Sequence, residues 1–148
     1  MSKLNDFLNP VQTKKEKKII ISDRFVERDE DGNILHDEKG DPILHPFTIR
    51  SISQEENEML LKRAKRIEVV NGQKQSTTDS TAYSRALVVA ATVDPDFSSK
   101  EVCDHFGTLD PTQVPAKMLW VGEYAKLLRE IVSVSGLDST EVEEELKN

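Results

Sequence analysis

The segment from residue 81 to residue 93, TAYSRALVVAATV, constrains the fold of this chain more than any other. On a helical period of about 3.6 residues, one side collects five of its residues: Tyr83, Ala86, Leu87, Ala90 and Val93. Further valines and alanines cover much of the remaining surface. A helix that is apolar nearly all round is buried, so we predict a central helix here, which Asp94-Pro95 ends.

The composition predicts one α+β domain with an aliphatic core. The chain has 148 residues, of which only 5% are aromatic, and a chain of this length has room for one modest core. Its formal charge of −7 argues against general nucleic-acid binding, which needs a concentrated positive field, and leaves a basic protein partner open. Cys103 is the only cysteine, and no run approaches the roughly 20 apolar residues of a membrane span. We therefore expect a soluble protein of the cytoplasm.

The N-terminal third of the chain carries the signals of an antiparallel sheet. The segment 18–28, KIIISDRFVER, is β-branched at its start, and its side chains alternate in facing afterwards, as in a strand. The Asp-Gly pair of DEDGN at 29–33 is typical of a tight hairpin turn. A second short strand and a Gly-Asp-Pro turn follow, and then a third strand that contains Pro46. Proline is confined to sheet edges or bulges. We predict a β-meander over residues 18–52, preceded by an extended, flexible arm, 1–17.

Capping signals predict helices through the rest of the chain. Ser53 and Glu56 form a capping box, from which we expect a helix to about residue 67. Residues 68–81, with Asn-Gly at 71–72, are predicted to be a mobile loop. Ser98 with Glu101 predicts a second short helix, and Asp110 before Pro111 a third. The fold class is thus an N-terminal antiparallel β-meander or hairpin followed by a mostly α-helical part, in one domain over 18–137, with an acidic tail over 138–148.

The stretch 117–137, KMLWVGEYAKLLREIVSVSGL, carries an apolar stripe spanning roughly 160° of a helix, which is wider than one packing partner usually covers. Two interpretations are open for Trp120: it plugs the core, or it is an interface hot spot. Glu123 is expected to complement the start of the helix. We predict partner contacts from six residues: Trp120, Val121, Tyr124, Leu127, Leu128 and Ile131.

No chemistry is predicted for this chain: no catalytic residue, no cofactor and no metal site. Counted from Asp29 as a calcium loop, the sixth position is Ile34 where glycine is needed, and the twelfth is Gly40 where glutamate is needed. Cys103 and His105 diverge on a helix, and zinc needs four converging ligands. Nucleophile elbows, phosphate loops and dinucleotide fingerprints are absent from the sequence. The protein is expected not to be an enzyme.

Five segments in order resemble the tail assembly chaperones of long-tailed bacteriophages and related prophages, in particular the XkdN-like group. They are FLNP, ISDRF, FTIRSISQEENEML, RALVVAATVDPDF with the following HFG, and KMLWVGEYAKLLREIVSVSG. The resemblance covers residues 4–137. The insertion at 27–45 is longer than the usual hairpin of the family, and the segment beyond Asp138 matches nothing in it.

This resemblance implies an assembly factor of the host cytoplasm that is absent from the finished particle. It would bind the tape measure protein, keep it soluble and extended, and help to recruit subunits of the major tail tube protein, with self-association possible and no nucleic-acid or membrane partner. A structural tail component, such as a tail-completion or connector protein, is the alternative. An enzyme or metal protein using His36, His45 or His105 ranks last. The basic run of Lys14, Lys15, Lys17 and Lys18 is either a solvated lead-in to the sheet or a contact for an acidic partner.

Overall fold

A computed structural model describes residues 3–12 and 14–137, and helix α3 (Ser80–Ala91) lies at its centre. Asp79 caps the helix by accepting a hydrogen bond from the amide of Ala82 at 3.1 Å. Tyr83, Leu87 and Val88 are buried along it. The predicted central helix is therefore confirmed. It ends two residues earlier than expected, because Thr92–Asp94 leaves the helix to form strand β5.

A three-stranded antiparallel sheet lies beside this helix, in the order β1 (Glu16–Ile19), β2 (Phe47–Arg50), β5. The buried side chains of Phe47 and Ile49 make β2 the apolar centre of the sheet. The predicted N-terminal antiparallel strands are thus present. The prediction that Pro46 places this strand at a sheet edge is wrong, because the proline precedes the central strand of the sheet. The register of that strand shifts shortly after, between Thr48 and Ile49.

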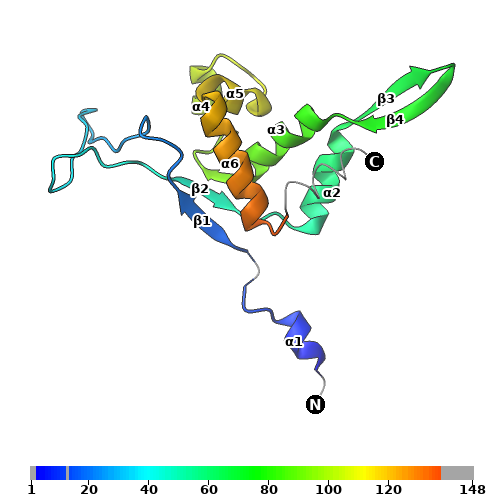
Figure 1. The fold of residues 1–148 in the computed structure, drawn as a ribbon, viewed down its shortest axis with the longest axis horizontal. Coiled ribbons are helices and arrows are strands. Elements are labelled where there is room, and N and C mark those ends of the chain that lie inside the picture. Colours follow the sequence, from blue (N-terminus) through cyan, green and yellow to red (C-terminus); the bar gives the residue numbers. More distant parts are fainter. Residues whose placement is uncertain (1–2, 13, 138–148) are drawn as a thin grey trace.

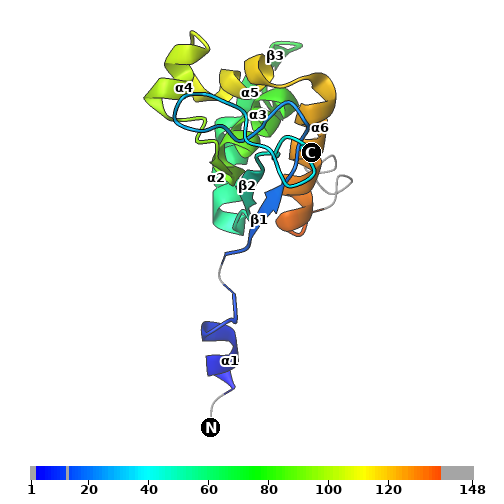
Figure 2. The ribbon, with the colours of Figure 1, turned by 90° about the vertical axis from the view of Figure 1, so that its left-hand side faces the viewer.

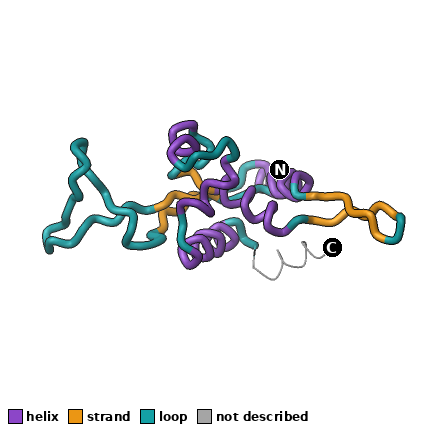
Figure 3. The backbone as a smooth tube through the Cα atoms, turned by 90° about the horizontal axis from the view of Figure 1, so that it is seen from above, coloured by secondary structure: helices purple, strands orange, loops and turns teal. Residues whose placement is uncertain are grey.

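The excursion between β1 and β2 replaces the predicted continuous meander. Its extended segments close a ring of backbone hydrogen bonds: the amide of Glu27 donates to Ile43, that of Ile43 to Leu35 and that of Leu35 to Glu27, at 2.8 to 2.9 Å. Two equivalent turns join the segments. In each, an aspartate side chain, Asp29 or Asp37, accepts from backbone amides two and four residues later. Figure 3 shows the resulting three-sided loop at one end of the molecule.

Helix α2 (Gln54–Arg63) begins with the predicted capping box: Ser53 accepts from the amide of Glu56 at 3.1 Å, and Glu56 accepts from that of Ser53 at 3.3 Å. The predictions that follow are wrong. The helix stops at Arg63, and the expected loop is a hairpin of β3 (Lys65–Val70) and β4 (Gln73–Thr78). Asn71 and Gly72 both have positive φ at its turn, as a tight two-residue hairpin requires.

The C-terminal helices are α4 (Lys100–His105), the 3-10 helix η1 (Pro111–Gln113), α5 (Val114–Met118) and α6 (Val121–Val134). Ser99 caps α4, one residue after the predicted Ser98. Asp110 caps η1 as predicted, by accepting from the amide of Thr112 at 3.0 Å. The chain is therefore α+β, with all its strands before residue 95 and only helices after it in the described part of the chain.

Three parts project from this body. The three-sided loop and the β3–β4 hairpin lie at opposite ends (Figures 1 and 3). The N-terminal arm with helix α1 (Leu4–Leu8) extends away below the body in Figure 1. The arm thus contains a helical turn where an extended chain was predicted. Viewed from the side, α6 lies on one side of the body and α2 and α4 on the other (Figure 2). The predicted acidic tail, 138–148, lies outside the described residues.

Candidate partner-binding surface

The start of α6 is held by Glu123, whose carboxylate accepts a hydrogen bond from the amide of Trp120 at 2.7 Å. Only 6% of Glu123 is exposed. Its negative charge lies where the helix presents unpaired amides and the positive end of its dipole. The predicted role of Glu123 at the start of this helix is confirmed.

Arg24, from the other end of the sequence, completes this buried site. Its guanidinium donates to both carboxylate oxygens of Glu123 and, at 3.0 Å, to the carbonyl of Met118. Ser22 also donates to Glu123. The hydrogen bond from Arg24 is the main cause that lowers the pKa of Glu123 to about 2, against the opposing effect of burial. The carboxylate is therefore ionised and ties the three-sided loop to α6.

The indole of Trp120 lies over this ion pair, with the guanidinium of Arg24 4.3 Å from the ring centroid. Stacking of this kind is a cation–π interaction, which orients the ring without burying it. Trp120 keeps 65% of its surface exposed, and Val121 keeps 90%. The interpretation in which Trp120 plugs the core is therefore wrong, and the ring faces solvent in a fixed orientation.

The six predicted contact residues do not form one surface. Leu127 and Ile131 are fully buried in the core. Tyr124 and Leu128 are half-buried, and Trp120 and Val121 are exposed. We define the α6 surface as Trp120, Val121, Tyr124 and Leu128. Leu127 and Ile131 have no exposed area to offer a partner, so they do not enter the proposal below.

Sequence reasoning missed other exposed apolar side chains. Ile67 and Val69 lie two residues apart on β3, so they share one face of the hairpin, and they are 72% and 69% exposed. Phe7 and Leu8, on the arm, are 81% and 64% exposed. The i, i+2 spacing in KRIEVV was the available signal for the hairpin.

Two of the residues considered for metal binding, Cys103 and His45, have other partners. No group of three or more His, Cys, Asp or Glu side chains converges within residues 3–12 and 14–137. The buried thiol of Cys103 lies 3.4 Å from the carbonyl of Phe97. His45 lies 3.3 Å from the carboxylate of Asp94, with which it shares a hydrogen bond at the sheet edge. In the described part of the chain, no helix has the length and apolar character needed to cross a membrane.

Comparisons with known proteins cover nearly the whole chain. Residues 4–147 match the family described as phage XkdN-like tail assembly chaperone protein. The sequence is 32% identical over 137 residues to the phage-like element PBSX protein XkdN of Bacillus subtilis, covering 90% of this chain and 84% of that protein. It is also 32% identical to the B. subtilis protein YqbN, covering 96% and 91%. The crystal structure of YqbN superposes with a TM-score of 0.65 at 30% identity, covering 89% of this chain and 95% of that one.

Proposed function

Because this chain belongs to the XkdN-like family of phage tail assembly chaperones, we propose that it binds and solubilises the tape measure protein. It also helps to recruit tail tube subunits, associates with further copies of itself, acts in the host cytoplasm and is not retained in the mature virion. The α6 surface supports this proposal most directly, since it presents an exposed aromatic ring that its own chain already orients.

A tape measure client, as the family resemblance describes it, is long and largely helical. Amphipathic helices bind apolar grooves and patches through side chains spaced three and four residues apart. Trp120, Tyr124 and Leu128 follow this spacing along α6. Tryptophan and tyrosine dominate interface energetics where they are held rigidly. One such patch binds weakly, but many copies along a single filament bind strongly and remain individually displaceable.

The test is co-expression with the tape measure protein of the same phage. We expect the wild-type chain to keep the tape measure protein soluble and to co-purify with it. Val121→Asp should abolish both effects, because it places a charge on the α6 surface beside Trp120. Leu109→Asp is the matched control, since Leu109 is 99% exposed elsewhere in the molecule. Both substitutions should leave the circular dichroism spectrum unchanged. Equal co-purification of both variants would show that the α6 surface does not hold the client.

Mass spectrometry of purified virions separates the chaperone from the alternative of a structural tail component. We expect the chain to be absent from particles while it is abundant in the infected cell. Stoichiometric amounts in the virion would instead favour a tail-completion or connector protein.

A further inference from the structure

The N-terminal arm exposes apolar side chains to solvent in the part of the chain that the structure describes. Leu4, Phe7 and Leu8 of α1 are 57%, 81% and 64% exposed. The arm points away from the body in both side views (Figures 1 and 2). Among the described residues, the chain is next anchored at Lys15, whose amide donates to the side-chain hydroxyl of Ser51 at 3.0 Å and whose carbonyl accepts from the amide of Ser51 at 2.7 Å. An amphipathic turn displayed this way costs solubility unless another surface covers it.

A groove suited to such a turn lies on the body between α2 and α3. It has a volume of about 540 Å³, and the apolar part of its lining includes Ala86, Val89, Ala90 and Val93. Volumes between about 300 and 1,000 Å³ are typical of sites that take a few apolar groups. Helix α6 lies on the other side of the body from α2 (Figure 2), so the groove is separate from the α6 surface.

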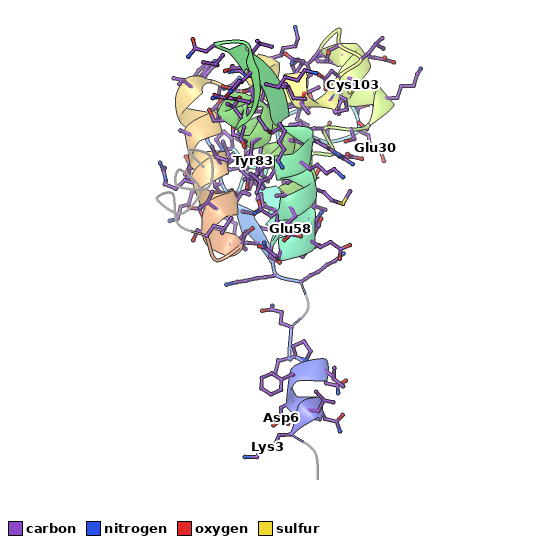
Figure 4. All side chains as sticks on the ribbon, turned by 90° about the vertical axis from the view of Figure 1, so that its right-hand side faces the viewer. Lys3, Asp6, Glu30, Glu58, Tyr83 and Cys103 are labelled. Atoms are coloured by element: carbon purple, nitrogen blue, oxygen red, sulfur yellow. The ribbon has the colours of Figure 1, made fainter. Side chains whose placement is uncertain are left out.

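Three charged residues line the groove, Arg50, Arg63 and Asp96, and Arg50 is already paired with Glu56. Arg63, at the end of α2, makes no ion pair within the described residues. Asp96 also lines the groove, and one of its oxygens accepts from the amide of Ser98 at 3.0 Å. The arm carries the complementary pair: Lys3 and Asp6 are three residues apart, which places them near one face of the α1 turn. Figure 4 labels both on the arm, well away from the body.

We propose that the α1 arm of one copy docks in the α2–α3 groove of a second copy, with Phe7 and Leu8 on the apolar part of its lining, Asp6 facing Arg63 and Lys3 facing Asp96. This inference rests on the self-association that is part of the proposed function and names the contact that produces it. Arm and groove are different surfaces, so the contact is heterologous, and a docked pair of copies keeps one free arm and one free groove. Repetition therefore builds an open chain of copies, each of which presents its own α6 surface.

Two variants block the two halves of the contact without touching the core. Phe7→Asp disables the arm and Val93→Asp the groove; their wild-type side chains are 81% and 42% exposed. In sedimentation velocity, the wild-type chain should show a mass that rises with concentration, and each variant alone should remain a monomer. An equimolar mixture should form a dimer and nothing larger, because one intact arm and one intact groove remain. Leu109→Asp should behave as the wild type.

Several results would overturn the proposal. A wild-type chain that is monomeric at all concentrations would show that the arm docks on its own body or on another protein. A variant that associates like the wild type would exclude the arm or the groove as the contact. A mixture that stays monomeric would exclude pairing between the two surfaces.

A charge exchange tests the orientation of the docked arm. Asp6→Arg and Arg63→Glu should each weaken association about tenfold, and the double variant should recover most of that loss. Additive weakening in the double variant would exclude the pairing of these two residues. These measurements need no tape measure protein, so their failure leaves the co-expression test of the α6 surface untouched.

Discussion

The start and the middle of the α6 segment are both apolar in sequence, but they differ in solvent exposure. Leu127 and Ile131 are sealed in the core, whereas Trp120 and Val121, about two helical turns earlier, face solvent. The wide apolar stripe therefore combines exposed residues at its start, buried residues further on, and the half-buried Tyr124 and Leu128 on its flank. What distinguishes the exposed start is the ion pair between Arg24 and Glu123, which fixes the start of the helix and supports the exposed indole from beneath.

The largest effect should come from truncating the buried half. Leu127→Ala removes a fully buried side chain, and because the core cannot collapse completely around the cavity, the free energy of unfolding should fall by about 2–5 kcal/mol. Val121→Ala, at an exposed position on the same helix, should change it by less than about 0.5 kcal/mol. Denaturant unfolding at pH 7 measures both. Similar losses for the two variants would contradict the division of the helix.

Removing the ion pair between Arg24 and Glu123 should have the next largest effect on stability. Glu123→Gln leaves Arg24 without its anionic partner, and we expect a loss of about 2 kcal/mol at pH 7. The folded-state pKa of about 2 lies below the ordinary value of 4.5. This contribution is therefore complete above about pH 5 and is lost as the pH falls toward 2, since the unfolded chain takes up the proton first.

Between about pH 6 and pH 3, the free energy of unfolding should therefore fall less steeply with decreasing pH for Glu123→Gln than for the wild type. Glu56→Gln is the matched control. Glu56 also has a pKa lowered to about 2 by its arginine partner, Arg50, but 37% of its side chain is exposed. Solvent screening should make its effect the smaller one. Equal losses of stability in the two variants would show that burial does not strengthen the ion pair of Arg24 and Glu123.

Trp120→Ala should lower stability less than Leu127→Ala or Glu123→Gln does, but it should weaken binding of the tape measure protein strongly. Losing the stacked ring removes a cation–π contact worth about 0.5–1 kcal/mol. Binding of the tape measure protein should weaken at least about tenfold, as expected for an oriented aromatic anchor. Thermal unfolding and a titration with a tape measure segment separate the two effects. A stability loss as large as that of Leu127→Ala would mean that the ring belongs to the core.

Local patterns in the sequence were sufficient for much of the fold. The apolar wrap of α3, the Ser53–Glu56 box, the Asp110 cap and the role of Glu123 all depend on residues within one or two turns of each other, and all are present. The helix from which a partner surface was expected was also located. The sequence could not show which of the six predicted contact residues would be buried in the core.

The features that were missed depend on distant partners or on weak local signals. Strand β5 leaves a helical pattern because Thr92 and Asp94 pair with β2, more than 40 residues earlier in the chain. Arg24 and Glu123 are 99 residues apart, so no spacing rule connects them. The hairpin was hidden because β4, QKQSTT, is uniformly polar, and its Asn-Gly turn was interpreted as a break and not as a type I′ connection.

The hairpin also provides the smallest predicted effect and the sharpest test of what makes an exposed apolar residue functional. Ile67 and Val69 are as exposed as Trp120. The nearby ion pair of Arg66 and Glu68 belongs to residues that alternate with them along β3 and so lie on the other face of the hairpin, and it does not stack on their side chains as Arg24 stacks on Trp120. Ile67→Thr with Val69→Thr keeps the β-branched shape, so stability should change by less than about 0.5 kcal/mol. Co-purification of the tape measure protein should be unchanged as well, because side chains on a projecting two-stranded ribbon are not oriented in advance. Loss of the client in this double variant, in a chain that still folds, would show that exposure alone is sufficient and that the orientation of Trp120 by Arg24 is not what distinguishes the α6 surface.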